Sequence, residues 1–281
     1  MMLFTIDSAS NKLDTISLKF SAGFNLNVRN IYKDIFSPQI YLSNQNGNFD
    51  VYNGFITKGY TTKALNPDKF KVIAPNKLIV RARHIYSANE SNRALVRLNL
   101  SDSIKITKTY FFPRKKNGVF ANDGWLHYDK KHAMIFYMYF YRGIILSLDT
   151  NLVPLYEAKT IDTVTEAQLK TRSTYVRTKE GKSLKQNTQN GLPPFVYTYM
   201  TTYADKIYML PRLKADNETD DDLSANQAID VYAIKNGSYL YSFYVPKYKQ
   251  SKLIQFQLNN NRLNVIFDKY LVIYDFVETM R

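Results

Sequence analysis

Two histidines lie five residues apart in the segment GWLHYDKKHA, and this spacing could serve acid–base or metal chemistry. His127 and His132 flank Asp129 across a predicted turn. Imidazole titrates near neutral pH and is a common metal ligand, so the pair could share a proton or a metal ion. No third ligand follows at a spacing known for zinc sites, and the HExxH motif is absent. We therefore interpret both histidines as loop residues and predict no metal site and no catalytic residue.

Two other patterns resemble sites of known chemistry but lack a required residue. In EGKS (Glu180–Ser183), the first glycine of a phosphate loop would fall at Val176. DNETDDD (Asp216–Asp222) alternates carboxylates as a calcium loop does, but its sixth position is Asp221 and its twelfth is Gln227. The chain has no Cys, which excludes disulfides and thiolate catalysis. We expect no cofactor. The missing catalytic motifs favour a protein without enzymatic activity, and an enzyme stays the alternative.

Residues suited to ligand binding gather near the same histidine. Trp125, the only Trp of the chain, stands beside His127 and Tyr128 at a predicted strand end, and Arg142 follows the aromatic strand IFYMYFY. Loops and strand ends of a rigid scaffold commonly carry binding residues. The aromatic strand itself is apolar on both faces, which predicts core packing. We predict Trp125, His127, Tyr128 and Arg142 as the ligand-binding residues.

A repeated phrase indicates which elements must position these residues. It is an alternating strand of about five residues that usually ends in Asp or Asn, followed by a turn and a second strand. Its copies are LFTID, FDVYN, LVRLN, ILSLD, DVYAI and LVIYD. Measured from Asp7, successive equivalent positions are 46, 46, 50, 84 and 42 residues apart. Strand-rich repeats of about 40 to 50 residues are typical of propeller blades.

The repeat predicts an all-β fold, a β-propeller of four-stranded antiparallel blades. The spacing allows five blades, or six if the long interval hides one. We expect one propeller domain over residues 1–281, with a long insertion or a degenerate blade around 163–194, and the N-terminal strand closing the ring as part of the last blade. Evenly spaced hairpins of an unrelated β-sandwich are the alternative.

The blade motifs also resemble a known family. The segment DKIYML, then IDVYAIKNGSYLYSFYVP, then LNVIFDKYLVIYDF is similar to the six-bladed β-propellers of Bacteroidota, which resemble NHL and TolB-type propellers. The resemblance covers most of the chain and is strongest from Asp205 to Phe276. It implies blades rather than a reaction, so no catalytic residue is transferred. It also implies a periplasmic or cell-surface location, although the sequence shows neither a signal-peptide pattern nor a lipid-anchor Cys.

Charge is unevenly divided along the chain. Residues 1–140 contain 20 Lys or Arg and 9 Asp or Glu, and residues 141–281 contain 18 and 15, giving the net +14. Such a surplus attracts phosphates if it collects on one face. No block of like charge stands out, so we do not expect a nucleic-acid partner unless the first-half charges gather on one face.

Together these features predict a non-enzymatic binding or scaffold propeller that recognises a protein, peptide or glycan through one face of the ring. A propeller-type hydrolase or lyase acting on a glycan or lactone is one alternative. An anionic-polymer binder, driven by the basic surface, is the other. We expect a monomer without a transmembrane segment.

Overall fold

The computed structural model describes residues 2–6, 13–18, 20–21, 24, 31–44, 46–53, 56–62, 65–84, 93–113, 115, 118–169, 171–177, 183–189 and 191–277. Strands account for most of them, which confirms the predicted all-β class. Contacts divide the chain into two compact units. Unit 1 comprises Met1–Phe112, Lys130–Ala133 and Asp149–Val153, and unit 2 comprises Pro113–Asp129, Met134–Leu148 and Pro154–Arg281.

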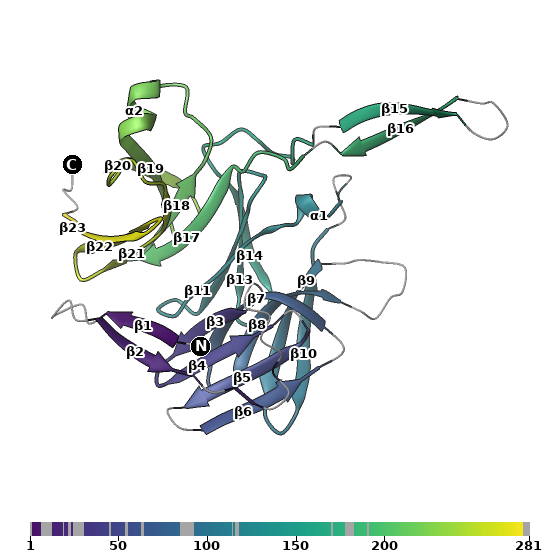
Figure 1. Ribbon diagram of the computed structural model, residues 1–281, viewed down its shortest axis with the longest axis vertical. Helices are drawn as coiled ribbons and strands as arrows, with labels where there is room; N and C mark the ends of the chain where they lie inside the picture. The colour runs from purple at the N-terminus through teal and green to yellow at the C-terminus, as the bar shows by residue number, and fades with distance from the viewer. Residues whose placement is uncertain are drawn as a thin grey trace. The chain divides into compact units, whose positions relative to one another are not determined.

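Unit 1 contains two four-stranded antiparallel sheets and one hairpin among its described residues (Figure 1). The hairpin pairs β1 (Met2–Ile6) with β2 (Leu13–Ser17). The first sheet consists of β3 (Tyr32–Phe36), β4 (Gln39–Ser43), β5 (Asn48–Asn53) and β6 (Ile56–Thr61). The second consists of β7 (Leu65–Ala74), β8 (Lys77–His84), β9 (Arg93–Leu100) and β10 (Ile104–Phe111). One buried apolar cluster spans both sheets, from Tyr41 and Phe49 to Val80 and Leu98.

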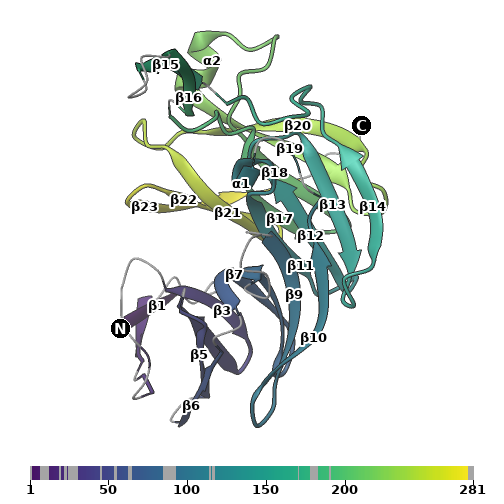
Figure 2. The same cartoon turned by 90° about the vertical axis from the view of Figure 1, so that its right-hand side faces the viewer.

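Among its described residues unit 2 contains one separate hairpin and three larger sheets that share two apolar cores (Figure 2). The first consists of β11 (Gly124–Asp129), β12 (Met134–Tyr139), β13 (Ile144–Asp149) and β14 (Pro154–Lys159). The second consists of β17 (Tyr197–Tyr203), β18 (Lys206–Pro211), β19 (Asn226–Ala233) and β20 (Tyr239–Pro246). The third consists of β21 (Leu253–Asn259), β22 (Arg262–Phe267) and β23 (Tyr270–Asp275). Short helices α1 (Gly118–Ala121) and α2 (Asp220–Ala225) lie in loops before β11 and β19.

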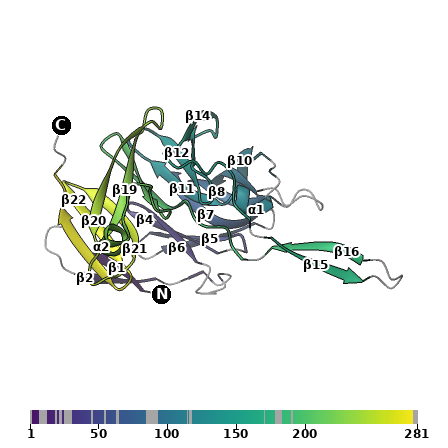
Figure 3. The same cartoon turned by 90° about the horizontal axis from the view of Figure 1, so that it is seen from above.

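The repeated phrase marks the third strand of each blade. Five copies fall on β5, β9, β13, β19 and β23, each the third strand of its sheet in chain order. The predicted β-propeller is confirmed, with five blades. The alternative of six blades is wrong: five blades are found, and in the described part of the long interval the extra strands are β15 (Thr171–Arg177) and β16 (Ser183–Gln189). These two strands pair only with each other among the described residues (Figure 3). The prediction of a single domain over 1–281 stays a prediction.

Closure of the last blade differs from the expectation. We expected the N-terminal strand to supply its fourth strand, but β1 pairs with β2 over Met2–Ile6, and the sheet of β21, β22 and β23 has three strands among the described residues. A partner a few residues away in sequence is cheaper in chain entropy than a distant one, which favours the local hairpin.

Asn and Asp form many of the tight turns, as the low glycine count of 10 requires. Asn76, Asp205, Asn260, Asn261 and Asp268 all have positive φ between paired strands. Asn and Asp tolerate this region better than other non-glycine residues. Gly237 takes the same region, at φ +70°, in the turn between β19 and β20. These turns set the register that places side chains on each blade face.

Candidate functional site

The sequence-predicted residues Trp125 and His127 lie on one face of β11. The Trp125 ring packs 4.9 Å, centroid to centroid, from that of Tyr199 on β17. The His127 Nε2 atom lies 2.9 Å from the hydroxyl oxygen of Thr202, also on β17. Both side chains therefore join two neighbouring blades of unit 2.

The other two predicted residues lie at opposite ends of the same sheet. Tyr128 pairs with Ile135 near the β11–β12 turn, and burial, followed by the charge of Asp129, raises its pKa. Arg142 lies beyond the other end of β12, only 5% exposed, with its guanidinium 3.8 Å from the centre of the Tyr139 ring. The structure thus brings Trp125 and His127 together and separates Tyr128 from Arg142. As a common binding site these four residues stay a prediction.

A cavity of about 780 Å³ lies elsewhere in unit 2, over strands β19 and β20 of its second sheet. One wall is the face of β19 and β20 on which Asp230 stands opposite Ser242 and Ala228 opposite Tyr244. The remaining walls come from residues 161–163, the segment 211–218 with Leu223 of α2, and side chains of 247–252. Figure 1 shows α2 beside β19. None of the four predicted residues lines this cavity.

Strand alternation explains why polar groups reach the cavity. Successive side chains of a strand point to opposite faces. Ile229 and Val231 of β19 are fully buried in the core shared with the β21–β23 sheet. Asp230 between them must therefore point to the other face, where the cavity lies. Cross-strand pairing puts the Ser242 hydroxyl directly opposite.

Asp230 is held by hydroxyl donors. The Ser242 hydroxyl donates to its Oδ1 at 2.6 Å, and the Tyr197 hydroxyl donates to its Oδ2 at 2.8 Å. The Tyr197 oxygen also lies 3.0 Å from that of Tyr232. Burial raises the pKa of Asp230, and the two hydroxyl donors oppose that rise. The carboxyl group is thus fixed in orientation at the inner end of the cavity.

Asp162 supplies a second carboxyl group to the cavity wall. It makes no hydrogen bond or ion pair with the part of the chain that the structure describes. Burial raises its pKa, and the negative charge of Asp230 adds to the rise. Of these two carboxyl groups, Asp230 is fixed by donors and Asp162 is available to a ligand, while Asp216 and Glu218 also line the cavity.

Three cationic side chains of the cavity walls form hydrogen bonds or ion pairs with neighbouring segments. Arg212 donates to the Thr198 hydroxyl at 2.8 Å and to the Leu253 carbonyl at 2.9 Å, linking three strands or their ends. Lys247 donates to the carbonyl of Leu223. Lys214 pairs with Asp220 at 2.6 Å. These contacts fix the cavity walls.

The acidic segment DNETDDD is a helix cap. Thr219 is the N-cap of α2, and its hydroxyl accepts from the Asp222 backbone at 3.1 Å while Asp222 accepts from Thr219 in return. Glu218 is buried and accepts from the Ala215 backbone at 2.8 Å. Among the described residues no three His, Asp or Glu side chains come together as metal ligands. The segment closes one wall of the cavity.

Sequence reasoning missed Asp230 although a signal was present. Asp230 is the first residue of a copy of the repeated phrase, and we interpreted only the Asp or Asn at the end of that phrase. In IDVYAI it lies inside the strand, between two core residues. A carboxyl group at such a position needs donors, and this need points to a polar pocket.

Comparisons with known proteins assign this chain to no family. No family model matches the sequence, and no curated protein is significantly similar to it. Similar solved structures include BamB from Moraxella catarrhalis, with TM-score 0.47, 12% identity and coverage of 98% of this chain and 79% of that one. A putative 6-phosphogluconolactonase from Bacteroides uniformis has TM-score 0.47, 13% identity and coverages of 97% and 86%. The computationally designed Ika8 protein has TM-score 0.49, 11% identity and coverages of 88% and 71%.

Membership of the six-bladed Bacteroidota family is not confirmed. Neither helix among the described residues has the length and hydrophobicity that a membrane crossing needs.

Proposed function

We propose that this protein is a binding propeller that takes a glycan or a polar peptide segment of a partner protein into the cavity over β19 and β20. The cavity carries this proposal. Its volume of about 780 Å³ is in the range of small-ligand sites, which bury most of a ligand. Its walls offer carboxyl, hydroxyl and amide groups. A relation to the Bacteroidota propellers, with a periplasmic or cell-surface location, is part of the same proposal.

Two tyrosines at this cavity favour a ligand that presents flat or aliphatic surfaces together with polar groups. Tyr239 is 43% exposed and Tyr244 is 48% exposed, and both line the cavity. A tyrosine supplies a large contact area at low entropy cost and a hydroxyl for hydrogen bonding. Sugar rings and peptide segments both combine these properties.

The test is binding of the full chain to printed arrays of glycans and of peptides, followed by calorimetry with the best probe. Y244A removes a cavity ring, and we expect it to weaken binding about tenfold, as loss of an interface aromatic commonly does. A228F narrows the cavity and should abolish binding. Y248A is the matched control, since Tyr248 is 39% exposed but does not line the cavity. Equal binding by all four proteins would reject the cavity as the site.

An enzyme acting on a glycan or lactone is the second candidate, favoured by the two carboxyl groups in one cavity. The pKa values of Asp162 and Asp230 are both raised by burial, and a raised pKa suits a carboxyl group to donate a proton. Turnover of a bound glycan or lactone that D162N abolishes without weakening binding would favour this candidate. Binding without turnover would reject it.

A further inference from the structure

One blade of unit 1 has a basic face. Residues 65–111 contain nine Lys or Arg against three Asp or Glu. In the register of β7–β10, Lys69 stands opposite Arg81, Arg83 opposite Arg93 and Lys108 opposite Arg97. Paired residues, and residues two apart on a strand, share a face. The face therefore contains Lys69, Lys71, Lys77, Arg81, Arg83, Arg93, Arg97, Lys105 and Lys108, which are all nine.

The opposite face fixes this arrangement. Leu78, Val80, Ala94, Val96 and Leu98 are all fully buried in the apolar core of unit 1. A one-residue slip of a strand would exchange its two faces and expose this core. The basic residues therefore cannot rearrange to the core side, and their clustering is a fixed property of the blade.

A β-bulge adds the edge strand to the same face. Lys105 and Lys108 are three residues apart and would point to opposite faces of a regular strand. The register of β10 shifts between Ile106 and Lys108, so Lys105 stands opposite Asn99 and Lys108 opposite Arg97. A bulge re-aims the side chains that follow it. Here it brings both lysines beside Arg97.

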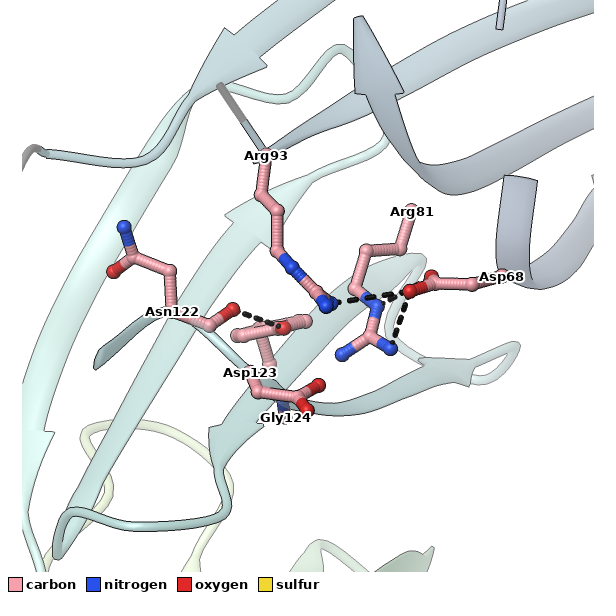
Figure 4. Close-up of polar contacts among 7 residues, drawn as sticks. Asp68, Arg81, Arg93, Asn122, Asp123 and Gly124 are labelled. Atoms are coloured by element: carbon pink, nitrogen blue, oxygen red, sulfur yellow. Dashed lines mark hydrogen bonds and ion pairs between the residues drawn. The ribbon is translucent and has the colours of Figure 1, made fainter. Parts of the chain in front are cut away.

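The inner part of the face is neutralised in part and buried. Arg81 donates to both carboxylate oxygens of Asp68, at 2.6 and 2.8 Å, and Arg93 donates to the same carboxylate at 3.1 Å (Figure 4). Arg81 is only 4% exposed. This bidentate pair stabilises the blade and is not part of the surface considered below.

The outer part of the face is a basic patch, defined as Lys77, Arg97, Lys105 and Lys108. The three lysines are exposed and make no hydrogen bond or ion pair with the part of the chain that the structure describes. Arg97 donates one bond, to the Asn151 side chain at 2.8 Å. Two acids lie close in the chain or through a contact: Asp102 in the β9–β10 turn, and Asp149, which accepts from the backbone of Asn151 at 2.8 Å. Strand geometry spaces the four cations by roughly 5 to 10 Å.

Like charges at directly opposed positions destabilise a sheet. Within the patch, Lys108 opposite Arg97 is such a pair. An anion bound between opposed cations converts their repulsion into attraction. The patch is thus arranged as an acceptor of several negative charges at once.

We propose that the basic patch binds the phosphate backbone of a nucleic acid. The sequence set the condition that first-half charges gather on one face, and nine of the 20 Lys or Arg of that half lie on this face. Protein interfaces and membrane-bound surfaces use exposed aromatic or apolar anchors. The exposed Phe111 of β10 stands opposite Ala94, on the other face. A surface of cations without such anchors suits sequence-independent contact with phosphates.

Lysines on an edge strand also prevent sheets from pairing edge to edge. This role explains Lys105 and Lys108, since β10 is an edge of its sheet, but it does not explain Arg97 on the inner strand β9. Charge reversal separates the two roles. Glutamate protects an edge as well as lysine does but repels phosphate.

The experiment measures binding of the full chain to a fluorescent single-stranded DNA oligonucleotide by anisotropy between 50 and 300 mM salt. Four phosphate contacts predict a slope of log affinity against log salt of about −3. K105E/K108E should bind at least about tenfold more weakly, with a slope nearer −1. The control K235E/K269E changes net charge equally at two exposed turns of unit 2 and should bind within about twofold of wild type. Two scrambled oligonucleotides should bind equally.

Three results would overturn the proposal. One is equal loss of binding in both double variants, which would show an effect of net charge alone. Another is retained binding in K105E/K108E with an unchanged salt slope. The third is binding to heparin or to anionic vesicles without binding to DNA or RNA. A thermal melt of each variant verifies that it is folded. The cavity proposal is independent of these outcomes, because its residues lie in unit 2.

Discussion

Asp230 and Asp162 show how the same cavity fixes one carboxyl group and leaves another without donors. Asp230 accepts hydrogen bonds from Ser242 and Tyr197, whereas Asp162 has no partner in the described part of the chain. Both have raised pKa values because burial disfavours their charged form. A carboxyl group without donors has nothing to offset this cost. A ligand that donates a hydrogen bond to Asp162 would therefore supply the donor that the described part of the chain does not.

Replacement of Asp162 by Asn should stabilise the protein at neutral pH. Burial raises the pKa of Asp162 in the folded state above its ordinary value of 3.8, so the folded state binds the proton more tightly and stability falls as pH rises through that window. D162N removes the titration. We expect its melting temperature to exceed that of wild type by about 2 °C at pH 7 and to converge with it near pH 4. Melts between pH 4 and 8 measure this difference. D216N, at an exposed Asp of the same cavity, should change little.

At the scale of elements, the hairpins could be predicted from the sequence, because strand alternation and turn residues are properties of short sequence segments. The third strand of each blade and the Asn- or Asp-containing turns follow from such patterns. The cavity could not be predicted in the same way, because its walls come from three separate parts of the chain: Asp162, the loop of Arg212 and strand β19. These segments meet only through tertiary packing. The basic face required the bulge in β10, which shifts the alternation by one residue and is not encoded by a glycine.

Helix α2 depends on its cap. T219A removes the hydroxyl that accepts from the Asp222 backbone, and loss of an N-cap costs about 1 kcal/mol. We expect faster hydrogen exchange at Leu223, whose amide bonds to the Thr219 carbonyl, and recovery in T219S. Hydrogen bonds from Thr219 lower the pKa of Asp222, so the capping contribution is present above pH 3.8 and is lost as pH falls through the lowered value. Unchanged exchange in T219A at pH 7 would contradict this role.

The β15–β16 hairpin should be dispensable for the blades. Its strands pair only with each other among the described residues, within the predicted insertion at 163–194. We expect replacement of residues 170–190 by a short Gly-Ser linker to change the melting temperature by less than about 2 °C. Deletion of β22 and β23 is the contrast, because Leu263, Val265 and Phe267 are buried in a core cluster of unit 2. A large loss of stability without the hairpin would show that it belongs to a blade.

For the whole molecule, the sequence predicts one propeller domain, and cooperativity of unfolding tests this prediction. Leu98 is fully buried in the core of unit 1, and Leu→Ala at such a site costs about 2 to 5 kcal/mol. The single Trp, Trp125, reports on unit 2. If the chain unfolds as one cooperative domain, L98A lowers two urea midpoints equally. One is the midpoint of Trp125 fluorescence, and the other is the midpoint of amide-hydrogen protection in β8. Domains that unfold separately would instead lose β8 protection while the fluorescence midpoint stayed at the wild-type value. V265A, in the core of unit 2, supplies the reciprocal measurement, because a single domain must transmit its destabilisation to β8 in the same way.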